Sequence, residues 1–94
     1  MENSQKEIML IAQEECAEVT QAISKIFRFG LLAKHPDQTA NNQERLEEEV
    51  GDLLCMIELM VEKNIIDRTK MLTAAGHKRN KLQKWSNIFQ KEEV

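Results

Sequence analysis

Four carboxylates occupy positions where a helical protein normally places apolar residues. A helical seam with alternating steps of three and four residues brings its members onto one face of the helix. In the first part of the chain that seam includes Glu15 and Glu18. In the second part Glu49 lies on a similar seam, and Asp52 follows it by three residues. Two helical segments therefore each place a carboxylate pair where a core residue is expected.

Carboxylate pairs in such positions need a counter-charge. Burying an unpaired ionised carboxylate costs on the order of several kcal/mol or forces the group to take up a proton. Four carboxylates together also repel one another, and a divalent cation resolves this conflict because hard oxygen ligands suit Mg²⁺ or Mn²⁺. The alternative is that these glutamates form a solvated helix face. From the residues alone, the two interpretations are about equally supported.

Other kinds of site are disfavoured by the remaining polar residues. A di-iron helical bundle needs Glu-x-x-His on two helices, whereas His35 and His77 stand apart from the carboxylates and are expected at the surface. Zinc ligation would need clustered Cys or His residues, and P-loop binding would need a glycine-rich loop; the sequence has neither. Cys16 and Cys55 are too few for a disulfide scaffold and are expected to be small packing residues.

The charge is unevenly distributed along the chain. The formal net charge is −3, but residues 1–64 carry a net −7 and residues 65–91 a net +6. A lysine-rich solvated helix end is the plain interpretation of the basic segment. The sharper hypothesis is that the acidic part holds cations while the basic part holds an anion. Nucleic-acid binding is not expected, because the chain has a single Trp and no recognisable reading helix.

Two helices are predicted to carry the carboxylates. Ser4 and Glu7 fit a capping box, and apolar residues at helical spacing continue to Gly30, a suitable helix end. Residues 30–40 contain the only proline and are predicted to form a loop. The next helix is predicted to begin near Asn41, with Glu44 three residues later, and to run through Val61.

The end of the second predicted helix and the segment after it also carry information. The stretch 53–61 has a single charge, which predicts burial on more than one side, partly against another copy of the chain. A tight connection at 64–67 leads to a third helix capped by Asp67, with Gly76 as a weak point in its middle. Residues 85–94 are predicted to form a tail.

Length and composition bound the class of protein. The 94 residues are enough for one domain, which is expected to span residues 1–94. Apolar residues make up 41% of the chain, and there are three Gly and one Pro. This composition predicts an all-α fold and excludes a disordered tail. No apolar stretch approaches the ~20 residues that span a membrane, and the polar start is unlike a signal peptide. We therefore expect a cytoplasmic protein, with a core small enough to make self-association plausible.

The carboxylate pattern resembles a known family. Glu14-Glu15-x-x-Glu18 followed by Glu49-x-x-Asp52 is similar to the EExxE…ExxD signature of the MazG-like, all-α nucleoside triphosphate pyrophosphohydrolases. The similarity extends through residues 11–30 and 47–54, and Lys78 stands where such proteins carry a lysine after the motif. The chain departs from the pattern in the 30 residues between Glu18 and Glu49, a long spacing, and in Gly76, where an Asn is common.

The resemblance implies a fold, a reaction and a set of site residues. The fold is a helical hairpin plus a third helix, completing a four-helix bundle in a homodimer or homotetramer. The reaction is Mg²⁺-dependent hydrolysis of a (deoxy)nucleoside triphosphate to the monophosphate and pyrophosphate, for cleaning or adjusting the nucleotide pool, with Mn²⁺ able to substitute. The implied metal ligands are Glu15, Glu18, Glu49 and Asp52. Either Glu14 or Glu18 would accept the proton of the attacking water.

Phosphate binding and base recognition are less sharply predicted. Lys78 would neutralise the phosphates together with Lys81, which shares its helix face and is favoured over Arg79; Lys25 and Arg28 are weaker candidates. Aromatic residues at 27, 29 and 85 could stack on a base, although a place in a small core is the favoured expectation. Two rival functions are a phosphoribosyl-ATP pyrophosphohydrolase and a non-catalytic helical oligomerisation module.

Overall fold

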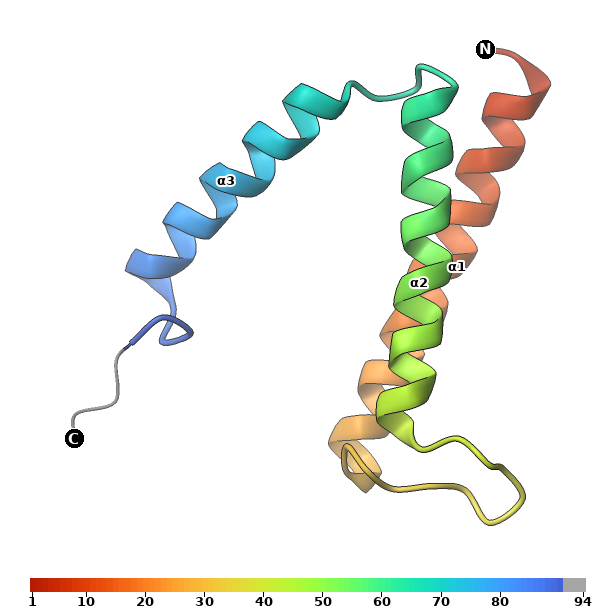
Figure 1. Ribbon diagram of the computed structural model, residues 1–94, viewed down its shortest axis with the longest axis vertical. Helices are drawn as coiled ribbons and strands as arrows, with labels where there is room; N and C mark the ends of the chain where they lie inside the picture. Colours follow the sequence, from red (N-terminus) through yellow and green to blue (C-terminus); the bar gives the residue numbers. More distant parts are fainter. Residues whose placement is uncertain (91–94) are drawn as a thin grey trace.

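The chain forms three helices in a computed structural model that describes residues 1–90. They are α1 (Asn3–Phe29), α2 (Asn42–Glu62) and α3 (Arg68–Trp85) (Figure 1). The described residues contain no strand, which confirms the all-α prediction. Of the predicted tail, Trp85 ends α3, residues 86–90 are irregular, and residues 91–94 lie outside the described part of the chain.

The first turn of α1 is capped by residues other than those expected. Gln5 Oε1 accepts a hydrogen bond from the backbone N–H of Glu2 at 3.0 Å, and Ser4 already lies inside the helix. Gln5 Nε2 also donates to the carbonyl oxygen of Lys63 at 2.9 Å. The prediction of a Ser4 cap was therefore wrong, because Gln5 is held by α1 and by the end of α2 at once.

The other helix boundaries follow the predicted signals. Gly30 ends α1 with φ of 104°, a backbone conformation that favours glycine. Asn41 caps α2 by accepting the backbone N–H of Glu44 at 2.8 Å, while Glu44 Oε1 accepts that of Asn41 at 3.1 Å. Asp67 caps α3 through the N–H of Lys70 at 2.9 Å. These side chains satisfy donors that a helix start otherwise leaves without partners.

Helices α1 and α2 lie side by side as an antiparallel hairpin (Figure 1). Its core, near the N-terminus of α1 and the end of α2, consists of the buried Ile8, Ala12 and Met56. Four partly buried apolar residues pack around them: Ile11, Leu59, Met60 and Ile65. Further along α1, towards the loop, Ala22 is the fourth buried residue. The hairpin is thus closed by apolar contacts on either side of the carboxylate positions.

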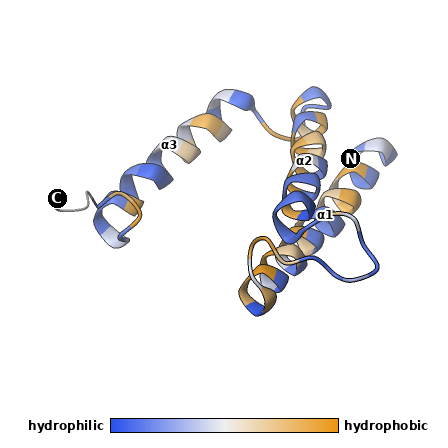
Figure 2. Ribbon diagram, turned by 60° about the horizontal axis from the view of Figure 1, so that its bottom comes forward, coloured by the Kyte–Doolittle hydropathy of each residue, from blue (hydrophilic) through white to orange (hydrophobic). Residues whose placement is uncertain are grey.

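Helix α3 extends away from the hairpin (Figure 1). An ion pair at its first residue, between Arg68 Nη2 and Glu58 Oε2 at 2.6 Å, links it to α2. That pairing lowers the pKa of the Glu58 carboxyl, mainly through the hydrogen bond from Arg68. No residue of α3 is buried, although apolar residues recur along it (Figure 2).

The chain exposes more surface than a compact protein of its mass. Its accessible surface is 7928 Å², whereas a compact monomer of 10.9 kDa exposes roughly 5,600 Å². Its radius of gyration is 16.8 Å, compared with about 12 Å for a compact domain of this length. A single copy therefore leaves a large part of its surface uncovered.

Within one chain, residues 53–61 are mostly half-buried, and their further burial against another copy stays a prediction. Met56 is the only buried residue of this stretch, and Leu54 is 55% exposed. Cys16 and Cys55 are free and exposed rather than packed, so the expectation that they are packing residues was wrong for the single chain. The physical reason is that a two-helix hairpin covers only one face of each helix.

Candidate metal centre

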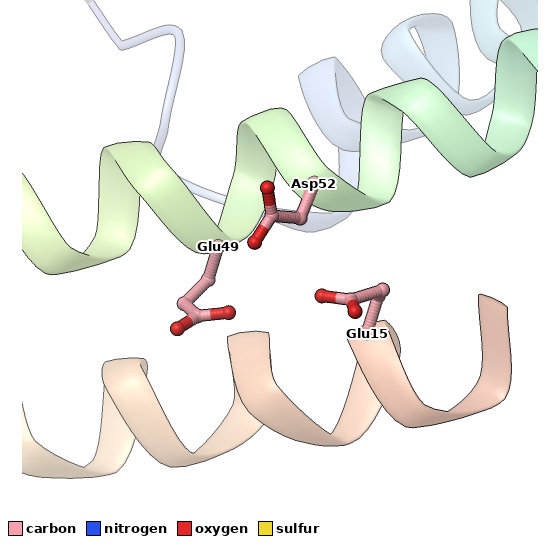
Figure 3. Close-up of side chains that lie close together, drawn as sticks. All are labelled: Glu15, Glu49 and Asp52. Carbon is pink, nitrogen blue, oxygen red and sulfur yellow. The ribbon is translucent and has the colours of Figure 1, made fainter. Parts of the chain in front are cut away.

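Three of the predicted carboxylates converge between the two helices of the hairpin. Glu15 reaches in from α1, and Glu49 and Asp52 reach in from α2 (Figure 3). One carboxylate oxygen from each of the three lies within 4.8 Å of the other two. Glu15 and Glu49 are partly buried, and Asp52 is exposed. We call Glu15, Glu49 and Asp52 the carboxylate cluster.

The hairpin itself creates this cluster. Residues three apart on a helix share a face, so the face of α2 that carries Met56 towards α1 also turns Glu49 and Asp52 in that direction. On α1, Glu15 follows the buried Ala12 by three residues and precedes the buried Ala22 by seven. The carboxylates thus interrupt an otherwise apolar contact between the helices, as their seam positions predicted.

The cluster is an electrostatically unfavourable arrangement without a cation. The pKa of Glu15 is raised above its ordinary value, first by burial and then by repulsion from Asp52, Glu49 and the two other glutamates of its motif. Neither ion pair formed by the described residues, Arg68–Glu58 or His35–Asp37, involves the cluster. Three convergent oxygen donors that form no ion pair match the ligand preference of a hard divalent ion.

Of the two other motif glutamates, only Glu18 lies beside the cluster. Glu18 is exposed and lines a small hollow that Glu49 also borders. Glu14 is exposed on α1 and borders neither the cluster nor the hollow. The structure therefore brings together three of the four expected metal ligands, with the fourth, Glu18, next to them.

Two cations border the same hollow. Lys25 comes from the last part of α1 and Arg45 from the first turn of α2, and both line the hollow with Glu18 and Glu49. The sequence interpretation included Lys25 and missed Arg45. The signal was available, because Arg45 precedes Glu49 by four residues and thus shares its face of α2.

The two lysines favoured for phosphate binding lie elsewhere in the single chain. Lys78 and Lys81 are exposed on α3, and among the described residues only α1 and α2 form an extensive helix–helix contact. Arg28, a weaker candidate, and Arg79, over which Lys81 was favoured, contact aromatic rings. Arg28 lies over the ring of Phe29 at 5.0 Å, and Arg79 lies over that of Phe89 at 4.7 Å.

The aromatic residues do not enter a core within the single chain. Phe27 is 86% exposed, Phe29 is 62% exposed and Trp85 is 82% exposed. The expectation of core packing was therefore wrong for the isolated chain, since the hairpin has only one covered face. His35 and His77 are exposed, as expected.

The fold and the site define an all-α protein with a carboxylate cluster between two helices, and sequence comparison gives its family. The family model of the MazG nucleotide pyrophosphohydrolase domain matches residues 3–84. The chain belongs to this family. No significant match was found among curated proteins or among solved structures. Within residues 1–90, no helix is long and apolar enough to cross a membrane.

Proposed function

We propose that this protein is a Mg²⁺-dependent nucleoside triphosphate pyrophosphohydrolase that acts on (deoxy)nucleoside triphosphates. It would release the monophosphate and pyrophosphate, and thereby clean or adjust the nucleotide pool. The observation that supports this most is the convergence of Glu15, Glu49 and Asp52 within a MazG domain. A MazG domain alone supports the general class of reaction, and the cluster adds a place for the metal.

The carboxylate cluster would hold the metal, with Glu18 as a further ligand. When bound, Mg²⁺ neutralises phosphate charge and lowers the pKa of a coordinated water. Water then adds to the α-phosphorus, the bond to the bridging oxygen breaks, and pyrophosphate leaves. Glu18 is better placed than Glu14 to accept the water proton, because it borders the hollow beside Glu49.

Cationic side chains are needed because a triphosphate carries about four negative charges at neutral pH, and the carboxylates of the site repel them. Lys25 and Arg45 border the hollow next to the cluster and can contact phosphate oxygens. Lys78 and Lys81 remain candidates if α3 of another copy brings them to the cluster.

A second copy of the chain is therefore part of the proposal. The excess exposed surface, together with the half-buried apolar residues of the stretch 53–61, supports a homodimer or homotetramer. In such an assembly, α3 of one copy would lie against the hairpin of another and complete a four-helix bundle.

The activity is tested with a panel of the eight common nucleoside triphosphates and deoxynucleoside triphosphates, in the presence and absence of Mg²⁺. Monophosphate and pyrophosphate should appear in equal amounts, and only with the metal. Release of orthophosphate and a diphosphate would contradict the proposed bond cleavage. Turnover of phosphoribosyl-ATP alone would favour the rival enzyme, and no turnover of any substrate would favour the non-catalytic module.

A further inference from the structure

A cavity of about 400 Å³ lies at the loop end of the hairpin. It is enclosed by the last turns of α1, the loop over residues 30–41 and the start of α2. Phe29, Ala33 and Pro36 provide apolar surface, Gln38 and Asn42 provide amides, and Lys34 and His35 complete the lining on the loop. The volume falls within the range of about 300–1,000 Å³ that small-molecule sites occupy.

Hydrogen bonds from the start of α2 hold the loop that forms this cavity. Asn42 donates its side-chain N–H to the carbonyl of Gly30 and its backbone N–H to that of Ala33, both at 2.9 Å. Gln43 donates its backbone N–H to the carbonyl of Leu31, also at 2.9 Å. These bonds fix the first part of the loop, residues 30–33, to the start of α2.

The cavity is continuous with the surroundings of the carboxylate cluster. Lys25, Asn42 and Arg45 line both the cavity and the neighbouring hollow. Glu49 in turn belongs to both the hollow and the cluster. The hairpin thus presents carboxylates, then the cations Lys25 and Arg45, then a space lined by apolar, amide and basic side chains.

This order matches the chemical order within a nucleotide. A triphosphate suits the metal-holding carboxylates, the cations beside Glu49 suit its phosphate nearest the sugar, and a base with its sugar suits a space with an aromatic ring and amides. An exposed aromatic face offers stacking, and amides offer both a donor and an acceptor to a base edge.

We propose that this cavity binds the base and sugar of the substrate, with Lys25 and Arg45 at its inner boundary contacting the phosphate nearest the sugar. This inference rests on the proposed function, because it takes the carboxylate cluster as the place where the bond between the α- and β-phosphates is cleaved. It assigns Phe29 to stacking on the base and the amides of Gln38 and Asn42 to its edge.

The binding test uses nuclear magnetic resonance on the ¹⁵N-labelled full chain with Mg²⁺. One probe is a deoxynucleoside triphosphate with an imido group between the α- and β-phosphates, and the other is inorganic tripolyphosphate. Both should shift the amide signals around Glu49, whereas only the nucleotide should shift those of residues 29–42. Identical effects of the two probes on residues 29–42 would overturn the proposal.

A matched pair of variants tests the same cavity by kinetics. Phe29→Ala should raise KM for deoxynucleoside triphosphates about tenfold through lost stacking, with no change in inhibition by tripolyphosphate. Phe27→Ala, two residues away and outside the cavity lining, should behave as wild type. Circular dichroism checks that both variants keep their helices.

The cavity and the activity can fail separately. If the wild type hydrolyses nucleotides and Phe29→Ala matches it in KM, the cavity assignment is wrong and the proposed function stands. If no nucleotide is hydrolysed but the nucleotide analogue alone shifts residues 29–42, the cavity assignment stands and the proposed activity is wrong.

Discussion

At the scale of single residues, the site consists of charges that disfavour folding when no metal is present. Glu15 is partly buried and is repelled by the carboxylates of Glu49 and Asp52. An apolar residue at its position would pack better against α2, so the glutamate is best explained by a ligand that needs it. The same reasoning predicts how stability responds to metal and to pH.

Added Mg²⁺ should raise the melting temperature of the wild-type protein, because a ligand that binds only the folded state stabilises it. Glu15→Gln should melt higher than wild type without metal, since one repulsive charge is removed, and should gain much less from Mg²⁺. Glu48→Gln, which removes an exposed charge next to the cluster, should keep the wild-type response. Equal metal responses of all three proteins in thermal melting would count against the metal centre.

The raised pKa of Glu15 makes metal-free stability depend on pH in a defined direction. Its ordinary pKa is about 4.5, and the folded state raises it, so above pH 4.5 the folded protein holds this proton more tightly than the unfolded chain. The free energy of unfolding is therefore higher below pH 4.5, where Glu15 is protonated. It falls as the pH rises through the raised pKa of Glu15.

Comparing wild type with Glu15→Gln isolates this effect from other titrating groups. The variant should gain stability relative to wild type as the pH rises from about 4 to 7 in urea unfolding experiments without divalent metal. A stability difference that does not change with pH, or that shrinks at pH 7, would show that Glu15 titrates normally.

At the scale of elements, the sequence specifies most helix boundaries because each depends on local chemistry. Gly30, Asn41 and Asp67 end or begin helices through their own backbone conformation or side-chain oxygen. The start of α1 could not be predicted in this way. Glu2–Gln5 and Ser4–Glu7 have the same spacing, and the bond from Gln5 to Lys63, 58 residues away, belongs to the tertiary fold.

Two glycine substitutions test the boundary at the end of α1. Gly30→Ala should lower the free energy of unfolding by about 1 kcal/mol or more, because φ of 104° is strained for alanine. Gly51→Ala in α2 should raise it by up to about 1 kcal/mol, since an added Cβ meets no atom within 4 Å and alanine favours helix. Chemical denaturation measures both, and equal effects would contradict the assigned boundary.

At the scale of the whole molecule, helix placement was the hardest property to predict. The carboxylate cluster followed from seam positions, because α1 and α2 have apolar faces that pair within the chain. The place of α3 did not follow, since none of its residues is buried and it forms no extensive contact with the hairpin. For the same reason Lys78 and Lys81 were predictable as candidates but not as neighbours of the cluster.

Mixed oligomers test whether α3 acts on another copy. One variant carries Glu15→Gln with Asp52→Asn, the other Lys78→Ala with Lys81→Ala, and each alone should have little activity. After co-refolding in equal amounts, sites shared between chains should restore about a quarter of the wild-type activity, as in random assembly of symmetric dimers. A mixture as inactive as its components would show that the lysines serve the site of their own chain, and a fully active lysine variant would show that they serve no site.

The central claim is that Glu15, Glu49 and Asp52 form the metal centre of a pyrophosphohydrolase. The most direct measurement is pyrophosphate release from deoxynucleoside triphosphates with Mg²⁺, compared among wild type, Asp52→Asn and the control Glu48→Gln. We predict Mg²⁺-dependent release by wild type and by the control, and a loss of about 100-fold or more in Asp52→Asn. Pyrophosphate release by Asp52→Asn at the wild-type rate, or no release by the wild type, would contradict the central claim.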